Sequence, residues 1–299
     1  MKHGFLLINK PEGPTSFNIV AKVRRVFGIK KVGHCGTLDP LADGLLVVAL
    51  GNATRLIQYL GDDKIYEFGV VFGKKTETGD REGKIIGESG KIPAKDELLA
   101  VIPKFIGEIS QTPPAFSAIK IDGKRAYELA RAGQEVEMKS RKIKIFSLEL
   151  LDFDFEQKTA KFRAHCSNGT YIRSLAQDIA ESCGSLGYCS SIKRISVGNF
   201  ELKNAVSAED ATEKDIISFD KAINFPKIKL DENGYQRARN GNFVHCKDTA
   251  CLVREESGLG EPNPYGKLDI DLIWLEFNGE IIALGRAENG RVQPVLVFC

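Results

Sequence analysis

A candidate catalytic carboxylate, Asp39, lies in the stretch from Gly33 to Gly51, GHCGTLDPLADGLLVVALG, close to His34. Such a carboxylate can attack a substrate as a nucleophile or stabilise positive charge in it. The pair Asp39–Pro40 also suits a helix start, because aspartate caps free N–H groups and proline fits the first helical position. The surrounding glycines favour a ligand site, since they let the backbone approach a ligand closely. Both roles stay open at this stage.

A second candidate group lies in the segment NGTYIRS, where Tyr171 and Arg173 are two residues apart. In an extended segment they would share one face. An arginine beside a catalytic carboxylate keeps that carboxylate ionised and oriented. The rings of Tyr66 and Tyr171 offer flat faces of the kind that stack on nucleobases. A surface arginine and two core tyrosines are the structural alternatives.

Composition indicates a globular protein: 299 residues, of which 42% are hydrophobic and 27% charged. The net charge of +2 does not predict a nucleic-acid partner, but basic residues gather in three places. Such groups attract phosphates when they share a face, and are otherwise solvated helix surfaces. They are Lys22, Arg24, Arg25, Lys30 and Lys31; Lys120, Lys124, Arg125 and Arg131; and Lys139, Arg141, Lys142 and Lys144.

Several protein classes do not fit the sequence. No apolar run is long enough to span a membrane, and the apolar piece near the N-terminus is too short for a signal peptide, so we expect a cytoplasmic protein. The seven cysteines include no CxxC pair, and the four histidines are scattered. We therefore expect neither a disulfide framework nor a metal site, and the sequence contains no cofactor motif.

The pattern of elements predicts an α+β fold. A helix is expected at Ser16–Phe27, with Ser16 as its cap, and another at residues 52–61. Because the strands do not alternate strictly with helices, the sheet should be mixed and largely antiparallel, with helices on its sides. Strands are expected at Gly44–Leu50, Ile65–Phe72, Lys144–Phe155, Lys158–Cys166 and Ser190–Phe200.

A domain boundary is expected near Phe225–Pro226, which divides the chain into residues 1–224 and 225–299. The second part begins with a short helix, Glu232–Arg239, and continues with strand candidates. Its FNGEI segment has the Asn-Gly pair of a tight hairpin turn. We therefore expect a small β-rich C-terminal domain.

Taken together, the motifs resemble those of the TruB-type bacterial tRNA pseudouridine synthases, which act on uridine 55 in the T-loop. This resemblance implies a pseudouridine synthase domain at residues 1–224, with an RNA-gripping insertion at about 111–142. Residues 225–299 resemble, more weakly, a PUA-type RNA-binding domain. The motifs are INKPEGPTS, GHCGTLDPLADGLL, YEFGVVFGKKTETGDREG, QTPPAFSAIKIDGKRAYELARAG, CSNGTYIRSLAQDI and IKRISVGNF.

The resemblance assigns catalytic roles to three residues. Asp39 falls on the essential aspartate of the family, and Arg173 falls on the arginine that pairs with it. Tyr66 falls on the tyrosine that stacks on the target base, and it is a candidate for removing the C5 proton. Whether Asp39 attacks ribose C1′, forms another adduct or assists an elimination stays open.

Four further residues are implied to bind the substrate or support the site. His34 falls on the family's histidine that contacts the RNA at the position in the base stack that the target base has left. Tyr171 lies in the pocket, and Ile192 takes the place of a leucine that packs against the base. Lys10 belongs to the motif that supports the loop of the aspartate.

The resemblance implies a tRNA substrate, recognised at the T-arm stem-loop, and an enzyme that works as a monomer without cofactor, metal, protein partner or membrane. Two alternatives remain. One is the catalytic subunit of a guide-RNA-dependent pseudouridylation complex. The other is a non-catalytic protein that binds or folds tRNA.

Overall fold

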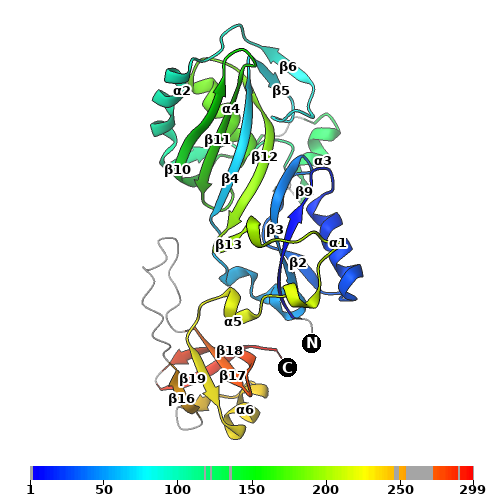
Figure 1. Cartoon of the computed structure of the whole chain (residues 1–299), viewed down its shortest axis with the longest axis vertical. Coiled ribbons are helices and arrows are strands. Elements are labelled where there is room, and N and C mark those ends of the chain that lie inside the picture. Colours follow the sequence, from blue (N-terminus) through cyan, green and yellow to red (C-terminus); the bar gives the residue numbers. More distant parts are fainter. Residues whose placement is uncertain are drawn as a thin grey trace.

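The protein is elongated, and its longest strands run along the long axis. The computed structural model describes residues 3–117, 119–121, 123–134, 137–245, 249–253, 272–288 and 290–298. In Figure 1, β4 (Lys64–Phe72) and β12 (Gly187–Val197) link an upper group of elements to a lower one. Parts of the predicted insertion at 111–142 and of residues 225–299 lie outside the described residues.

A mixed sheet of nine strands forms the larger part of the molecule. All neighbouring strands in it are antiparallel except β3 and β12, which are parallel, so the expected mixed and largely antiparallel sheet is confirmed. The strand order is β1 (Gly4–Lys10), β3 (Ala42–Leu50), β12, β4, β11 (Thr159–Cys166), β10 (Arg141–Asp154) and β7 (Gly107–Gln111); β2 (Val32–His34) pairs with β3, and β13 (Phe200–Glu201) with β12. Two small hairpins pair β5 (Lys74–Thr76) with β6 (Ile85–Glu88), and β8 (Lys120–Ile121) with β9 (Lys124–Arg125).

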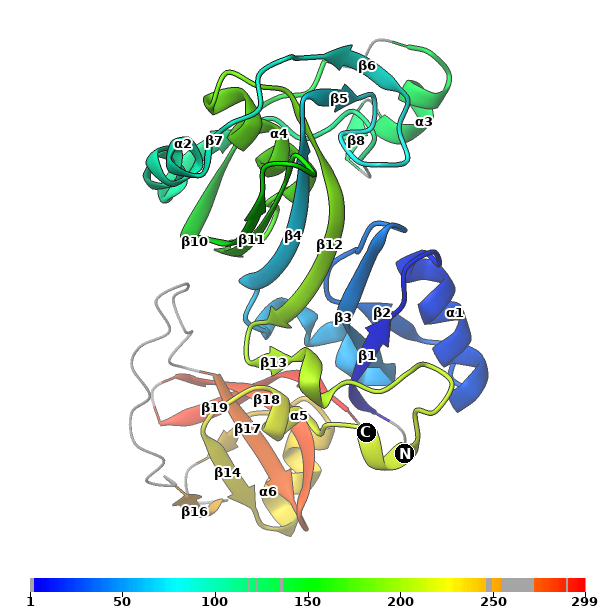
Figure 2. The same ribbon diagram turned by 45° about the horizontal axis from the view of Figure 1, so that its top comes forward.

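Helices cover the two halves of this sheet separately. In Figure 2, α1 (Ser16–Phe27) lies beside the lower strands, and α2 (Lys95–Val101) and α4 (Ile172–Ser182) lie beside the upper ones. No helix in the described part of the chain has the length and apolar character for a membrane crossing. The remaining helical segments are α3 (Ala126–Arg131) and α5 (Phe219–Ala222), and the 3₁₀ turns Gly51–Arg55, Ile57–Tyr59, Ile102–Phe105, Leu202–Asn204 and Glu213–Asp215.

Two local expectations need correction, and one alternative that the sequence left open is decided. The segment after Asp39 is a turn that leads into β3, so Asp39–Pro40 starts no helix. The cap of α1 is Thr15, whose side chain accepts a hydrogen bond from the Asn18 N–H, while the Ser16 hydroxyl bonds elsewhere. Residues 52–61 form two 3₁₀ turns rather than one α-helix.

The two halves of the sheet meet at a short parallel contact, which we call the seam. Residues Ala42–Gly44 of β3 pair with Ile192–Arg194 of β12, and these three pairs make up the whole β3–β12 register. Gly44 has a φ of +104° and lies so close to β12 that a Cβ would be 2.4 Å from the Arg194 carbonyl oxygen. The seam therefore requires glycine at this position.

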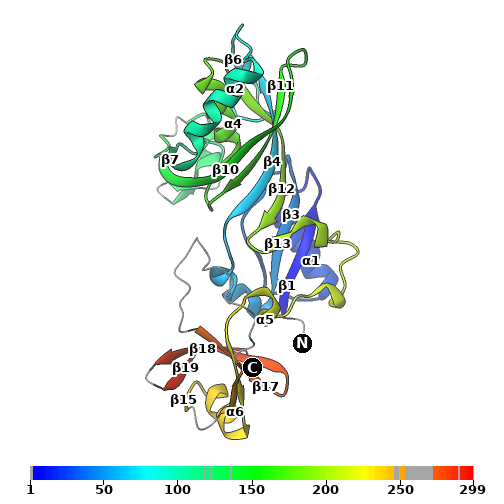
Figure 3. The same ribbon diagram turned by 60° about the vertical axis from the view of Figure 1, so that its left-hand side comes forward.

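A six-stranded sheet forms the C-terminal part and packs against the first sheet. Trp274 donates to the Ile223 carbonyl at 3.0 Å, and Arg55 donates to the Val297 carbonyl at 2.6 Å. The predicted helix α6 (Glu232–Arg239) is present, and the Asn278–Gly279 turn has positive φ at both residues. The division at residue 225 stays a prediction, and Figure 3 shows this sheet at the lower end of the molecule. The strand order is β15 (Val244–His245), β19 (Arg291–Val297), β18 (Glu280–Glu288), β17 (Leu272–Phe277), β14 (Lys227–Leu230) and β16 (Thr249–Val253).

The close approach at the seam predicts an unusually large cost for a methyl group at Gly44. Gly13 is a matched control, since its φ of +105° is nearly the same and nothing lies within 4 Å of its missing Cβ. Gly13→Ala should cost about 1–2 kcal/mol through backbone strain alone. Gly44→Ala should cost at least about 2 kcal/mol more, because backbone atoms of β12 must also move. Urea unfolding of both variants measures the difference, and equal costs would contradict the account of the seam.

Candidate active site

Asp39 and Arg173, 134 residues apart, form an ion pair at the centre of the site. Asp39 lies in the turn between β2 and β3, and Arg173 lies in the first turn of α4. The Arg173 Nε donates to Asp39 Oδ2 at 2.8 Å. Because the Arg173 side chain is buried, the pair is shielded from solvent on the arginine side.

The same guanidinium group contacts three further groups, which come from two other segments of the chain. Nη1 donates to the Thr78 carbonyl at 2.8 Å, and Nη2 donates to the Phe116 carbonyl at 3.0 Å. Nη1 also lies 3.7 Å from the Asp80 carboxylate. The Asp80 side chain is 6% exposed and the Asp39 side chain 35%. Of the two carboxylates next to Arg173, Asp39 is therefore the one that a substrate can reach.

The backbone of the Asp39 turn is fixed by buried side chains on both sides of the aspartate. The Ser16 hydroxyl accepts from the Leu38 N–H at 2.8 Å and donates to the Leu38 carbonyl at 3.1 Å. The Lys10 ammonium donates to the Pro40 carbonyl at 3.3 Å and to the Ala42 carbonyl at 2.5 Å. These bonds fix the direction of the Asp39 side chain before any substrate binds.

Lys10 is fully buried, and its pKa is lowered to about 8. Burial is the main cause, since desolvation disfavours the ammonium form. The negative charges of Asp43 and Asp39 act in the opposite direction, and the positive charge of Arg194 adds to the lowering. A third hydrogen bond, to the Pro11 carbonyl at 2.9 Å, uses the last ammonium proton.

Tyr66 and Ile192 lie beside the turn, on the two strands that meet next to the seam. Tyr66 of β4 is buried and stands opposite Arg194 of β12, while Ile192 pairs with Phe68 and with Ala42. Burial raises the pKa of the Tyr66 hydroxyl, and the nearby Arg194 only partly opposes this. The hydroxyl is therefore protonated at neutral pH.

His34 and Tyr171 lie at the ends of the elements that carry Asp39 and Arg173. His34 ends β2, its pKa is lowered mainly by burial, and its buried Nδ1 has no hydrogen-bond partner among the described residues. Tyr171 precedes α4, and its ring faces the Arg141 guanidinium at 5.4 Å. The Gln111 side chain bonds both backbone groups of Tyr171, accepting from its N–H at 2.8 Å and donating to its carbonyl at 3.1 Å. The seven predicted site residues thus come from segments that meet around one turn.

Comparisons with known proteins agree on the family. The profile described as TruB family pseudouridylate synthase (N terminal domain) matches residues 24–172. The whole chain is 37% identical to the tRNA pseudouridine synthase B of Rickettsia africae (strain ESF-5) and covers 98% of that protein. It is also 37% identical to the tRNA pseudouridine synthase B of Rickettsia bellii (strain OSU 85-389), of which it covers 99%. The chain belongs to the TruB family of pseudouridylate synthases.

Solved structures show the same fold. A chain from the crystal structure of a Cbf5-Nop10-Gar1 complex matches with a TM-score of 0.68 and 26% identity, over 100% of this chain and 84% of that one. A chain from the structure of an H/ACA RNP bound to a substrate RNA containing 2′-deoxyuridine matches with a TM-score of 0.67 and 23% identity, over 99% and 85%. This TruB-family chain therefore shares its fold with both of these chains over most of their length.

Four residues position the site of this TruB-family chain although the sequence analysis gave none of them that role: Ser16, Asp80, Gln111 and Arg194. Each lies inside a motif that was recognised, and each is buried. In the strand segment IKRISV, alternate side chains are buried, and Arg194 occupies one of these buried positions. A charged residue at such a position is the sequence feature that could have indicated its role. Nothing in the sequence points to the backbone groups that Ser16, Gln111 and Arg194 bind, because these groups lie far away in the chain.

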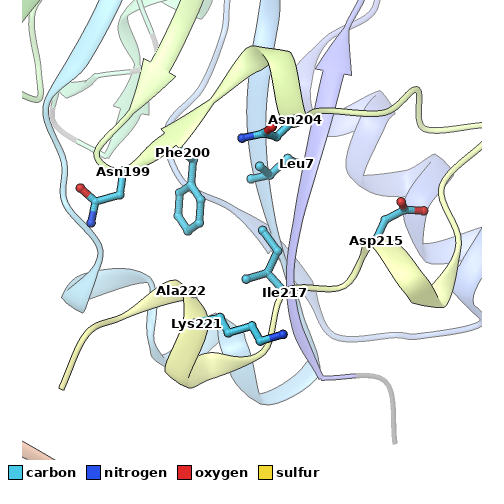
Figure 4. A pocket seen from close by; sticks show the side chains of 8 residues that line it. All are labelled: Leu7, Asn199, Phe200, Asn204, Asp215, Ile217, Lys221 and Ala222. Carbon is cyan, nitrogen blue, oxygen red and sulfur yellow. The ribbon is translucent and has the colours of Figure 1, made fainter. Parts of the chain in front are cut away.

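Neither of the two best-defined cavities in the described part of the chain contains the Asp39–Arg173 pair. The cavity in Figure 4, of about 360 Å³, is lined by Leu7, Phe200, Asn204 and Lys221 among others. Leu7 belongs to the apolar cluster on one face of the sheet, whereas Tyr66 belongs to the cluster on the other face. The cavity in Figure 4 thus adjoins the face of the sheet opposite to Tyr66. Among the described residues, no group of three His, Cys, Asp or Glu side chains is arranged to hold a metal ion.

The lowered pKa of Lys10 predicts a loss of activity at alkaline pH. A neutral amine has two N–H donors, while three carbonyls accept from Lys10, so the turn loosens as the proton leaves. The turnover number should fall severalfold as the pH rises through about 8. Lys10→Met should be slower throughout and should lack this pH-dependent step.

The free energy of unfolding should change in the opposite direction to activity: the contribution of Lys10 to it should rise as the pH rises above about 8. Between about pH 8 and the ordinary lysine value of 10.5, the unfolded chain binds more protons at this position than the folded chain. Lys10 alone therefore favours folding as the pH rises. A parallel loss of activity and of folded protein, or a pH step that persists in Lys10→Met, would contradict the assignment.

Proposed function

We propose that the protein isomerises uridine to pseudouridine at position 55 in the T-loop of tRNA, with Asp39 as the essential carboxylate. One observation carries this proposal: a partly exposed Asp39 is bound by a buried arginine, on a turn fixed by buried hydrogen bonds, in a chain of the TruB family. The tRNA substrate follows from the relatives named above, which share the whole length of the chain.

The reaction breaks the bond from ribose C1′ to N1, rotates the uracil and forms a bond from C1′ to C5. The C5 proton leaves and N1 gains a proton, so no electrons are exchanged. An ionised carboxylate at C1′ supplies what this chemistry needs, whether as a nucleophile or as a counter-charge. Arg173 contacts Oδ2 of Asp39, and no described residue donates a hydrogen bond to Oδ1. Oδ1 is therefore the oxygen available to the ribose.

The remaining site residues handle a uridine that has left the base stack. Extruding a base costs a few kcal/mol, and stacking on an aromatic ring returns about 1–3 kcal/mol. Tyr66 supplies the ring and Ile192 the apolar contact on the neighbouring strand. His34 is uncharged because burial lowers its pKa, which suits contact with bases rather than with phosphates. Tyr171 lies at the start of the helix that carries Arg173.

Exposed basic residues supply the contacts to the RNA backbone. In the group on and after α1, Lys22 pairs with Glu209 and Arg24 bonds the Val32 carbonyl. Arg25, Lys30 and Lys31 are exposed and have no acidic partner among the described residues. They are available to phosphates, and binding should weaken with salt. The side chains of Lys120 and Arg131 lie outside the described residues. We further propose a monomeric, cytoplasmic enzyme whose insertion at 111–142 and PUA-like domain at 225–299 contact the tRNA.

A second candidate function is the catalytic subunit of a guide-RNA-dependent complex. The likeness of this chain to a Cbf5-Nop10-Gar1 structure over its whole length favours it. The higher identity to tRNA pseudouridine synthases, which match the chain from end to end, favours the stand-alone enzyme. Turnover by the isolated protein on bare tRNA separates the two.

The test is Asp39→Asn, assayed by tritium release from tRNA labelled at C5 of its uridines. The variant should fold and bind tRNA, but release no tritium, because an amide can neither attack C1′ nor stabilise its charge. Asp43→Asn is the matched control from the same motif. The Asp43 carboxylate is as exposed as that of Asp39, and among the described residues its one ion pair is with Lys193 on the surface. At a pH of about 6, where Lys10 keeps its proton without the help of the Asp43 charge, this variant should retain normal turnover. Normal turnover by Asp39→Asn would refute the proposed function.

A further inference from the structure

Arg194 is a fully buried arginine that makes no ion pair within the described part of the chain. Moving an arginine out of water costs several kcal/mol unless its donors find partners. A leucine or methionine would avoid this cost in a strand that only had to pack. The hydrogen-bond partners of Arg194 therefore indicate which role a charged side chain has at this position.

Those partners belong to the two segments that carry Asp39 and Tyr66. Nε donates to the Leu45 carbonyl at 2.7 Å, and Nη2 donates to the Gly36 carbonyl at 3.1 Å. Nη1 lies 3.5 Å from the Thr37 carbonyl and 3.5 Å from the Tyr66 hydroxyl. One rigid group thus connects the start of the Asp39 turn, the strand that follows the turn and the tyrosine on the neighbouring strand.

We propose that Arg194 is a positioning residue that sets the distance and orientation between the Asp39 turn and the Tyr66 hydroxyl. This inference rests on the proposed function, in which Asp39 and Tyr66 act on the same nucleoside. Arg194 touches neither ribose nor base, and it acts through the two groups that do.

The geometry of arginine suits this role. A guanidinium presents its donors in one plane at fixed angles, whereas a lysine is a single point charge on a flexible stem. The register places Arg194 opposite Gly44 on one side and opposite Tyr66 on the other. Because the guanidinium donates to the tyrosine oxygen, the Tyr66 O–H proton must point away from Arg194. Arg194 therefore orients this hydroxyl as well as the turn.

The test compares Arg194→Lys with Lys64→Met, a control that removes another buried cation two residues from Tyr66. Lys64 donates to the Asp62 carbonyl at 2.5 Å and to Asn168 Oδ1 at 3.2 Å, and it makes no hydrogen bond to the Asp39 turn. The measurements are single-turnover rate, tRNA dissociation constant and urea unfolding. Arg194→Lys should lower the rate by about 100-fold, the effect of a misplacement of about 1 Å, with the dissociation constant nearly unchanged. Lys64→Met should lower stability without a comparable loss of rate.

Three outcomes would overturn the inference. The first is a normal rate in Arg194→Lys. The second is an equal loss of rate in Lys64→Met. The third is failure of both Arg194→Lys and Arg194→Gln to fold, because Arg194 would then serve stability alone. A normal rate in Arg194→Lys beside an inactive Asp39→Asn removes only this inference, while an active Asp39→Asn removes the proposed function itself.

Discussion

The parallel contact between β3 and β12 is the constraint on which the rest of the structure depends. It joins the two halves of the large sheet through three residue pairs, Ala42–Gly44 with Ile192–Arg194. The turn that carries Asp39 enters the sheet at this contact. Tyr66 lies opposite Arg194, the last residue of the contact on β12. Elements from both halves thereby meet at one place. The segments that carry Asp39, Tyr66 and Ile192 are brought together there because the strands are held in register.

Buried cations then hold the turn, and the Asp39 side chain on it, in one orientation. Lys10 and Arg194 bond mostly to backbone carbonyls, and Arg173 bonds to Asp39 and to two carbonyls from other segments. Each buried charge is costly, and the fold recovers this cost only if most donors find acceptors. The benefit lies in preorganisation: groups that need not move during the reaction stabilise developing charge most effectively.

Much of the fold could be predicted from the sequence, because strands and helices repeat local patterns. The boundaries of α1 and α6 match the expected helices, and the chain places Asp39 near Arg173 as the family resemblance implies. Local patterns failed where a side chain serves a distant segment. Ser16 has the type and place of a cap, yet its hydroxyl bonds Leu38, 22 residues away. Asp39–Pro40 has the form of a helix start, but the strand that follows directs it into a turn.

The most direct test of the account is to map pseudouridine, nucleotide by nucleotide, in unmodified tRNA treated with the purified protein alone. The account predicts one modified position, uridine 55 in the T-loop, without a guide RNA or a second protein. Modification at another position, or none until a guide RNA is supplied, would contradict it.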